Sequence, residues 1–361
     1  MPVYKDNKGK WYIKYKNQTK RGFLTKKEAE KFEAKMKLEE TENNCNCSFD
    51  TIAKDYLSYK KTTVSYGTYN KYKTAYDDVI SKLLPVNTKA KDIDKMDCRK
   101  FCEKLRDSDY STEHKNYIIT LLKSIFKHGV LYFNLKENPS TAIERCKKTY
   151  DELLKDKEKE MNIWTVEEFN KFIAEIDNPV YKTLFIVLYY TGMRLGEALA
   201  LKWKDYENGR FDIYKSITYK TEKNLYEEKQ PKNSNSIRKI SVGNNVASII
   251  MNYKKEEEKI PGFKESWYMF GRNRPLPTTS IDRYKNKACE TAKVKRIRIH
   301  DLRHSHASYL ISMGVNIVAV SRRLGHSDVN MTLKVYTHLF KNKEDEITEI
   351  LDNSSQNLLK E

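Results

Sequence analysis

Four segments in the second half of the sequence carry side chains suited to chemistry on a phosphodiester. In the first, residues 191–199 (TGMRLGEAL), an apolar stretch runs into a glycine, and Arg194 stands where a new helix is expected to begin. A guanidinium beside the free backbone N–H groups of a helix start is a good place to hold a phosphate. Taken alone, an arginine in this position is more often the ion-pair partner of a residue such as Glu197.

The second and third segments add candidates for proton transfer and for nucleophilic attack. His300 and Arg303 in residues 300–304 (HDLRH) stand three apart and share one face of a predicted helix. An imidazole can manage a proton while a guanidinium stabilises phosphate oxygens. Further on, a Gly-His pair ends at His326, and Tyr336 follows ten residues later. A tyrosine phenolate can attack phosphorus and leave again, but one tyrosine among 25 carries no weight by itself.

The fourth segment is residues 230–238 (QPKNSNSIR), which we interpret as the turn of a β-hairpin. Lys232 in this turn is placed to protonate a departing oxygen as a general acid. A solvated turn lysine is the ordinary alternative. Three other lysines close to this turn are alternative candidates: Lys223, Lys229 and Lys239.

The order Arg, Lys, His-x-x-Arg, Gly-His, Tyr resembles the catalytic set of the tyrosine recombinases. The flanking residues match as well, in residues 191–197 (TGMRLGE), 298–307 (RIHDLRHSHA) and 323–338 (RLGHSDVNMTLKVYTH). The resemblance covers about residues 162–340 and combines several motifs. It implies an enzyme that cuts and rejoins DNA strands.

The resemblance also implies a role for each residue of the set. Tyr336 would attack the scissile phosphate, form a 3′-phosphotyrosyl link and release a 5′-hydroxyl. Arg194 and Arg303 would clamp the non-bridging oxygens, and Lys232 would protonate the departing 5′ oxygen. The remaining expectations are a role in the tyrosine proton transfer for His300, a hydrogen bond to the phosphate for His326, and supporting roles for Glu197 and Asp301.

Charge and composition agree with a DNA partner. The chain has 361 residues, a net charge of +18 and an isoelectric point of about 9.3. Such an excess suggests a polyanion, although a lysine-rich solvated surface would give the same number. Neither a signal peptide nor an apolar run of about 18 residues is found, so we expect a cytoplasmic protein with no membrane partner. The sequence contains neither a Gly-x4-Gly-Lys loop nor a Gly-x-Gly-x-x-Gly motif, and we expect no cofactor.

The cysteines are expected to be reduced thiols in a protein that is not secreted. Cys45 and Cys47, with Cys98 and Cys102, would give four thiolates, but their spacing is not that of a zinc ribbon or finger. We therefore expect no metal site.

The chain is predicted to be multidomain and mainly α. Residues 1–44 form a small β-sheet with a helix, and residues 48–145 form a helical domain whose start signals include Asp94 and Ser111. Residues 146–161 are mostly charged and form an exposed linker. A mixed α+β catalytic domain covers 162–340, followed by a tail helix at 341–361. The N-terminal sheet is strongly basic, and its candidate DNA contacts are Lys10, Lys14, Lys16, Lys20 and Arg21.

This layout resembles phage and conjugative-transposon integrases of the lambda type. The resemblance implies an arm-binding domain, a SAM-like core-binding domain and a catalytic domain, acting as a homo-tetramer on synapsed double-stranded DNA to integrate and excise a mobile element. An excisionase and a DNA-bending host protein are possible further partners, and the tail would dock on a neighbouring subunit. The alternatives are a type IB topoisomerase-like enzyme, a telomere resolvase, a dimer-resolving recombinase, or a non-catalytic DNA-binding protein. The basic N-terminal sheet favours the integrase.

Overall fold

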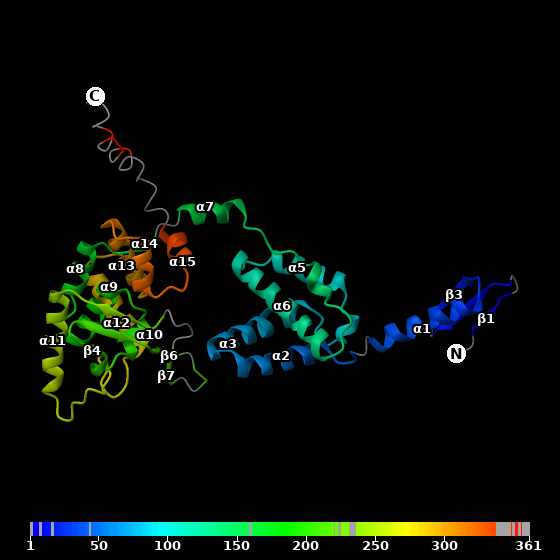
Figure 1. The fold of residues 1–361 in the computed structure, drawn as a ribbon, viewed down its shortest axis with the longest axis horizontal. Coiled ribbons are helices and arrows are strands. Elements are labelled where there is room, and N and C mark those ends of the chain that lie inside the picture. The colour runs from blue at the N-terminus through cyan, green and yellow to red at the C-terminus, as the bar shows by residue number, and fades with distance from the viewer. Residues whose placement is uncertain are drawn as a thin grey trace. The chain divides into compact units, whose positions relative to one another are not determined.

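The computed structural model describes residues 3–6, 9–15, 18–42, 45–158, 161–219, 221–222, 225–230, 236–336, 348, 351–352 and 355. The chain divides into two compact units, Met1–Glu158 and Lys159–Glu361, and Figure 1 labels many of their elements. The first unit contains a small sheet and a group of helices, and the second combines helices with short strands. The predicted multidomain, mainly α fold with an N-terminal sheet is confirmed.

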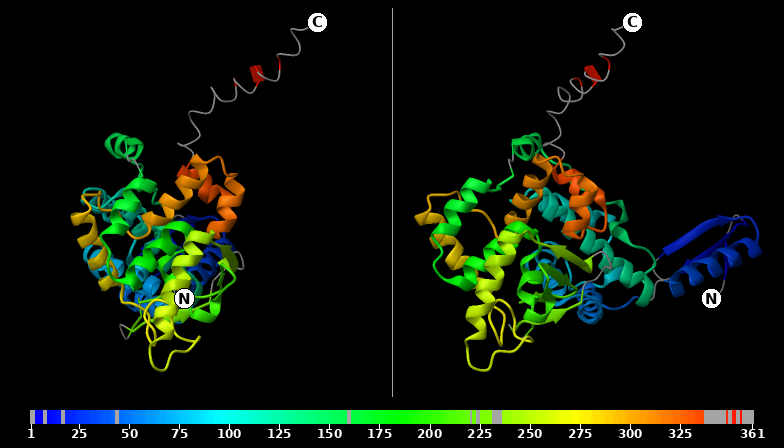
Figure 2. Two further views of the ribbon diagram at one scale, coloured as in Figure 1. Left: turned by 90° about the vertical axis from the view of Figure 1, so that its left-hand side faces the viewer. Right: turned by 60° about the vertical axis from the view of Figure 1, so that its left-hand side comes forward.

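The first unit begins with an antiparallel sheet in the order β1-β2-β3, flanked by one helix. Figure 2 shows this helix lying along the sheet. Its start is capped, because the Thr25 hydroxyl accepts from the Glu28 N–H at 3.2 Å and the Glu28 carboxylate accepts from the Leu24 N–H at 3.1 Å. The bounds are β1 Tyr4–Lys5, β2 Trp11–Tyr15, β3 Gln18–Phe23 and α1 Lys26–Glu42.

The rest of the first unit is helical and has its own core. Phe49, Ile52, Phe101 and Phe126 are fully buried because apolar residues recur at helical spacing. The elements are α2 Phe49–Thr63, α3 Tyr66–Ala75, the π-helical turn η1 Tyr76–Ile80, α4 Ser81–Leu83, η2 Ala90–Asp92, α5 Lys95–Arg106, α6 Thr112–Tyr132, η3 Pro139–Ala142 and α7 Tyr150–Glu158.

The segment expected to be an exposed linker contains α7, which is fixed to the helical core. The Glu152 carboxylate accepts hydrogen bonds from the Thr112 hydroxyl at 2.7 Å and from the Thr112 N–H at 3.3 Å. It therefore satisfies the first turn of α6, where backbone N–H groups have no partner within the helix.

The second unit is built around α9, which contacts α8, α10, α11 and α13. Aromatic rings join α8 to α9: Phe172 packs edge-on against Phe185 and also contacts Trp164, and Phe169 stacks on Tyr189. The helices are α8 Val166–Ala174, α9 Pro179–Thr191, α10 Leu195–Ala200, η4 Trp203–Asp205, α11 Asn244–Glu258, α12 Thr278–Thr291, α13 Asp301–Ser312, α14 Ile317–Leu324 and α15 Val329–Tyr336.

The strands of this unit correct one expectation. They are β4 Tyr206–Glu207, β5 Arg210–Ile213, β6 Ser216–Thr218, β7 Glu227–Lys229 and β8 Arg238–Ser241. The predicted hairpin around residues 230–238 is wrong, because β7 pairs with β6 whereas β8 pairs with β5. Buried Phe211 and Ile240 stand opposite each other in the β5–β8 pair. Burial of this apolar pair favours the pairing of β8 with β5, although β7 is nearer to β8 in the sequence.

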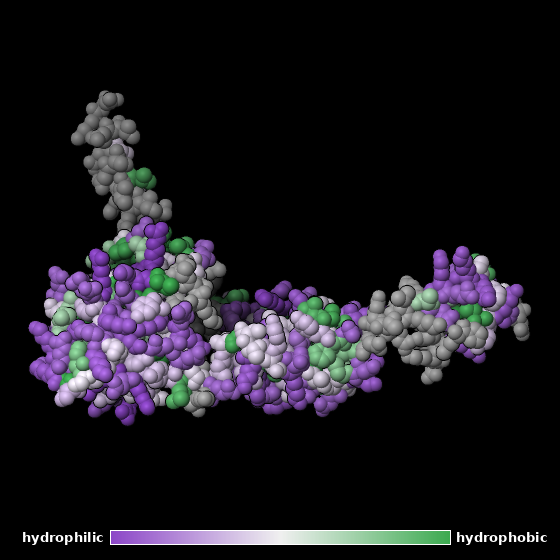
Figure 3. Space-filling view, turned by 60° about the horizontal axis from the view of Figure 1, so that its bottom comes forward, coloured by the Kyte–Doolittle hydropathy of each residue, from purple (hydrophilic) through white to green (hydrophobic). Residues whose placement is uncertain are grey.

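Figure 3 shows one face of the molecule, on which hydrophilic side chains predominate and apolar side chains form small separate groups. Within the described residues, no helix has both the length and the apolar character needed to cross a bilayer. The predicted tail helix at 341–361 lies almost wholly outside the described residues, as does Lys232.

Candidate active site

Arg303 is the best-buried cation of the predicted set. It lies in the first turn of α13 with 3% of its surface exposed. Its guanidinium donates to the carbonyl of Gly192 at 2.9 Å and to the carbonyl of Leu324 at 2.7 Å. These two carbonyls belong to the C-terminal ends of α9 and α14, where carbonyl groups lack intrahelical partners and attract cations. Arg303 therefore joins the ends of two helices.

Both helices end in a left-handed glycine. Gly192 has φ +65° and Gly325 has φ +73°, a conformation that other residues rarely adopt. A Cβ on Gly192 would lie 2.5 Å from His306 Cδ2. Glycine is therefore required at position 192 both for the turn and for the close approach of α13, which brings Arg303 to the carbonyl.

Arg194 is the N-cap of α10, as expected, and its orientation is set by Glu197. The buried Glu197 carboxylate accepts from the Arg194 N–H, from Arg194 Nη1 and from Arg238 Nη2, each at 2.8 Å. The arginines hold the pKa of Glu197 below its ordinary value although burial opposes this. Arg238 stands outside the motifs predicted to carry the chemistry, and it also donates from Nε to the Arg323 carbonyl at 2.8 Å.

These arginines place positive charge around Arg303. Burial, assisted by the charge of Arg194, lowers the pKa of Arg303 to about 9. The charge of Glu197 opposes this shift, but its oxygens are held by Arg194 and Arg238. Among the described residues, no carboxylate forms an ion pair with Arg303. Clustered cations with incomplete neutralisation form a site for an anion.

His326 follows the end of α14 and is held by a buried threonine. Its Nδ1 lies 2.7 Å from the hydroxyl of Thr332, which is 0% exposed. Burial and the charges of Arg303 and Arg194 lower the pKa of His326 to about 4. The ring is therefore neutral near pH 7 and suited to hydrogen bonding with an anion without being an ion itself.

Tyr336 ends α15 and is 1% exposed, packed with Ala307 and Leu324. Burial raises the pKa of its hydroxyl, while the charge of Arg303 opposes this rise. The hydroxyl oxygen lies 2.9 Å from Nδ1 of His304. A base for the tyrosine proton was expected at His300, but the imidazole in contact with the hydroxyl belongs to His304.

His300 is exposed and stands just before α13. Its ring lies edge-on to that of His304, with the centroids 5.1 Å apart. Burial of the ring and the nearby His304 and Arg303 lower its pKa below the ordinary value. His300 is thus next to the site, in ring contact with His304.

Asp301 supports the start of α13, as expected. Its buried carboxylate accepts from the backbone N–H and the guanidinium of Arg298, each at 2.8 Å. The Asp301 carbonyl accepts from the Ser305 hydroxyl, which in turn accepts from the Trp164 N–H at 2.9 Å. These bonds fix α13 against the segment that precedes α8.

The predicted DNA contacts of the N-terminal sheet lie on two different faces. Lys14 and Arg21 share the face that α1 leaves open, where Arg21 lies over the Tyr12 ring. Lys20 pairs with buried Ile13 and lies over a ring of α1, so it is on the other face. Lys10 is exposed just before β2, and Lys16 lies outside the described residues.

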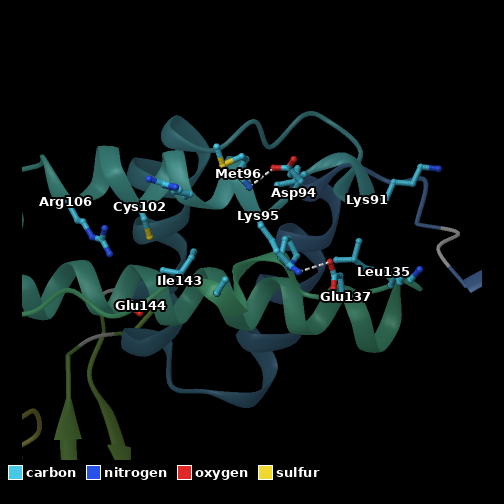
Figure 4. Close-up of a pocket in the computed structure, with 15 residues that line it drawn as sticks. Lys91, Asp94, Lys95, Met96, Cys102, Arg106, Leu135, Glu137, Ile143 and Glu144 are labelled. Atoms are coloured by element: carbon cyan, nitrogen blue, oxygen red, sulfur yellow. Dashed lines mark hydrogen bonds and ion pairs between the residues drawn. The ribbon is translucent and has the colours of Figure 1, made fainter. Parts of the chain in front are cut away.

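A hollow of about 930 Å³ lies in the helical part of the first unit, between α5 and the region of η3 (Figure 4). In Figure 4, the Lys95 ammonium pairs with Glu137 at 3.5 Å. The basic residues that line the hollow are Lys91, Lys95, Arg99, Arg106 and Lys136. None of the predicted catalytic residues lines it, so its size does not mark the site of the chemistry.

Among the described residues, no group of His, Cys, Asp and Glu side chains is arranged to hold a metal ion.

The buried Glu197 is predicted to be essential for the stability of the second unit. We expect Glu197→Gln to lower the free energy of unfolding by about 3 kcal/mol, because it leaves two arginine charges without a carboxylate. The pKa of Glu197 is lowered in the folded state, so its contribution is complete above its ordinary value of 4.5 and is lost as the pH falls through the lowered value. Urea unfolding of both proteins at several pH values measures this difference.

The matched control for this variant is Glu207→Gln, which changes an exposed carboxylate of β4. It is expected to shift stability by less than about 0.5 kcal/mol. Equal unfolding midpoints for the wild type and the Glu197 variant near neutral pH would contradict a stabilising role for this ion-pair network.

Comparison with known proteins agrees with the geometry of the site. Residues 162–343 match the phage integrase family, and residues 48–106 match the N-terminal SAM-like domain of phage integrases. The chain is 32% identical over 346 residues to the ICEBs1 integrase of Bacillus subtilis, with 91% of this chain and 90% of that protein covered. It is 25% identical over 351 residues to the integrase of Staphylococcus phage L54a, with 89% and 99% covered.

Solved structures show the same fold at lower identity. The Tn1549 transposon integrase in complex with circular intermediate DNA has a TM-score of 0.64 and 18% identity, with 84% of this chain and 99% of that chain covered. A lambda integrase dimer bound to a COC′ core site has a TM-score of 0.57 and 14% identity, with 92% and 93% covered. The chain therefore belongs to the phage integrase family and is a site-specific tyrosine recombinase of the lambda type, an enzyme that integrates and excises a mobile element.

Proposed function

We propose that Tyr336 attacks the scissile phosphate of a DNA strand, forming a 3′-phosphotyrosyl ester and releasing a 5′-hydroxyl. The observation that carries this proposal is the burial of the Tyr336 hydroxyl within range of the Arg303 charge, where Arg194 adds a second guanidinium. A nucleophile beside two cations fits attack on a phosphodiester, because negative charge develops on the non-bridging oxygens.

Each polar residue around Tyr336 has a role in this mechanism. Arg303 and Arg194 stabilise the developing charge, and the neutral His326 donates a hydrogen bond to the phosphate. Lys232 protonates the departing 5′ oxygen, and His300 assists proton transfer beside His304. Glu197 and Asp301 are positioning residues, because the former orients Arg194 and the latter fixes the start of α13.

The second half of the reaction reverses the first. The 5′-hydroxyl of a partner strand attacks the phosphotyrosyl ester, the bond from phosphorus to the tyrosine oxygen breaks, and the tyrosine recovers its proton. Because the ester keeps the energy of the broken bond, rejoining needs no separate energy source.

The partner of this chemistry is double-stranded DNA at core and arm sites. Residues 48–145 bind the core site and present the basic hollow of Figure 4, and the open face of the N-terminal sheet binds the arm site. A lambda integrase tetramer has been solved bound to a Holliday junction, and we infer a homo-tetramer on two synapsed sites for this chain. An excisionase and a DNA-bending host protein would set direction, and residues 341–361 would dock on a neighbouring subunit. The enzyme would act in the bacterial cytoplasm on nucleoid-associated DNA.

A two-ended excision assay tests the proposed function. A plasmid carries a marker flanked by the two ends of the mobile element and is incubated with the purified full-length chain and extract of the host. The expected product is a marker circle with joined ends and a resealed plasmid. Binding of the ends without any joined product would favour a non-catalytic DNA-binding protein.

The open face of the N-terminal sheet is predicted to control binding to arm DNA. Replacing Lys14 and Arg21 together by Ala should weaken binding to an arm duplex and lower the slope of log affinity against log salt by about two, since two phosphate contacts are lost. Excision should fall, while cleavage of a short core duplex should not change. Titration of labelled duplexes at several salt concentrations measures the slope.

The matched control is Lys20→Ala, because Lys20 lies on the face covered by α1. The Lys20 variant removes a positive charge from β3, the strand that also carries Arg21. We expect it to change the slope of log affinity against log salt by less than one. Equal effects of the Lys20 variant and the double variant would show that general charge, rather than the open face, sets the affinity.

A further inference from the structure

Among the residues that the structure describes, one imidazole is in direct contact with the tyrosine hydroxyl of the site. The Tyr336 oxygen lies 2.9 Å from His304 Nδ1, a normal hydrogen-bond distance. The two residues belong to different elements, α13 and α15, and Tyr336 is 1% exposed, so bulk water does not compete for this hydroxyl. His304 also lines a hollow of about 660 Å³ on the side of Asn162 and Val335.

The surroundings of the two rings favour a neutral pair. Burial raises the pKa of the tyrosine hydroxyl, so attack requires a base. Burial, with the charges of Arg298 and Arg303, lowers the pKa of His304, while Asp301 opposes this. The imidazole is then neutral near pH 7 and can accept at Nδ1 with its hydrogen on Nε2. The titratable and charged groups around His304 are His300, Asp301, Arg303, Arg298, His326, Tyr336 and, across the hollow, Lys285 and Arg296.

We propose that His304 is the general base that activates Tyr336, an inference that rests on the proposed function of Tyr336 as nucleophile. The hydroxyl proton moves to His304 Nδ1 as the tyrosine oxygen bonds to phosphorus and the bond from phosphorus to the 5′ oxygen breaks. The departing 5′ oxygen takes a separate proton from Lys232. In the reverse step the attacking 5′-hydroxyl gives its proton back to the neutral Lys232. His304, now an imidazolium, returns its proton to the tyrosine oxygen as that oxygen leaves phosphorus.

His304 is distinguished from His300 by its geometry. His300 is exposed and meets His304 edge-on at 5.1 Å between ring centroids. Among the described residues, no hydrogen bond joins the His300 ring to the Tyr336 hydroxyl, whereas His304 Nδ1 lies 2.9 Å from it. The residue that touches the reacting oxygen is His304, and this makes it a catalytic residue.

The asparagine variant separates a base from a residue that only holds the tyrosine. In His304→Asn, the amide oxygen takes the place of Nδ1 and can still accept the hydrogen bond, but an amide cannot take a proton. His304→Gln places its amide nearer the position of Nε2 and loses the contact with the hydroxyl. Both variants are compared with the wild type in single-turnover cleavage of a nicked duplex carrying the element's end sequence.

We expect His304→Asn to form the covalent adduct at least about 100-fold more slowly than the wild type near pH 7. The wild-type rate should level off once His304 is neutral. The variant rate should keep rising about tenfold for each unit of pH, because hydroxide must then remove the tyrosine proton. A residue that only positions Tyr336 would not change the slope of this profile.

A substrate with sulfur in place of the bridging 5′ oxygen tests the two proton transfers independently. Sulfur leaves without protonation, so this duplex should restore cleavage to a Lys232→Ala variant but not to His304→Asn. Duplex binding and the thermal unfolding midpoint of each variant show whether it is folded, and the pH slope is read from folded protein only.

A wild-type adduct together with a His304→Asn rate and pH profile equal to the wild type would overturn the role of His304 and leave the proposed function intact. Restoration of His304→Asn by the sulfur substrate would also overturn it, since the lost proton transfer would then be that of the leaving group. No adduct with wild-type protein bound to the duplex would overturn the proposed function itself.

Discussion

Tyr336→Phe is expected to abolish covalent attachment to DNA and strand cleavage, and to leave DNA binding unchanged. The substitution removes only the nucleophilic oxygen. The phenyl ring still fills the space beside Ala307 and Leu324, and loss of the hydrogen bond to His304 costs about 1 kcal/mol. The protein should therefore fold. An SDS gel detects the adduct, and a gel shift measures binding.

The matched control for this substitution is Tyr309→Phe. Tyr309 lies on α13 and is 38% exposed. The Tyr309→Phe variant should form the adduct at the wild-type rate. Adduct formation by the Tyr336 variant would mean that another residue attacks and would refute the assignment of the nucleophile.

Arg303→Lys is expected to reduce the rate of cleavage about 10³-fold or more, although the charge is formally conserved. The guanidinium holds the carbonyls of Gly192 and Leu324 in a fixed fork and has N–H groups left for a phosphate. An ammonium cannot reproduce this planar arrangement, and burial favours its neutral form. Single-turnover rates at saturating protein separate this loss from weaker binding.

The control for the arginine substitution is Arg283→Lys, on an exposed position of α12. Its cleavage rate should equal that of the wild type. If Arg303→Lys also cleaves within about tenfold of the wild type, positive charge alone is sufficient at this position and the forked geometry has no catalytic part.

Local features of the fold and of the site could be predicted from the sequence because they depend on nearby residues. Asp94 and Ser111 cap α5 and α6 through side chains that accept from N–H groups two or three residues ahead. Arg194 begins α10, because Gly192 ends the preceding helix and Glu197 can reach back to the Arg194 N–H. Each of these signals lies within one turn of helix.

Contacts between distant segments could not be predicted in this way. His304 and Tyr336 are 32 positions apart, and Arg238 and Glu197 are 41 apart. Nothing in the spacing indicates that their atoms meet, because this depends on how α13, α15 and β8 pack. The resemblance to the recombinase motifs assigned the proton transfer to His300. It gave no role to His304, which follows one helical turn later.

Strand patterns have the same limitation. Alternation along residues 18–23 separates two faces of a strand but does not say which face a helix will cover, so Lys20 and Arg21 were predicted to act together. The pairing of β8 with β5 instead of β7 likewise depends on the burial of Phe211 and Ile240 and not on their closeness in sequence.

Identification of the atom that joins protein to DNA is the most direct test of this account. The adduct formed on a nicked duplex is trapped, digested with protease and nuclease, and sequenced by mass spectrometry. We expect a single modified peptide carrying a nucleotide 3′-phosphate on Tyr336, together with a released strand bearing a free 5′-hydroxyl. A nucleotide on any other residue, or a 5′-phosphate link to Tyr336, would contradict it.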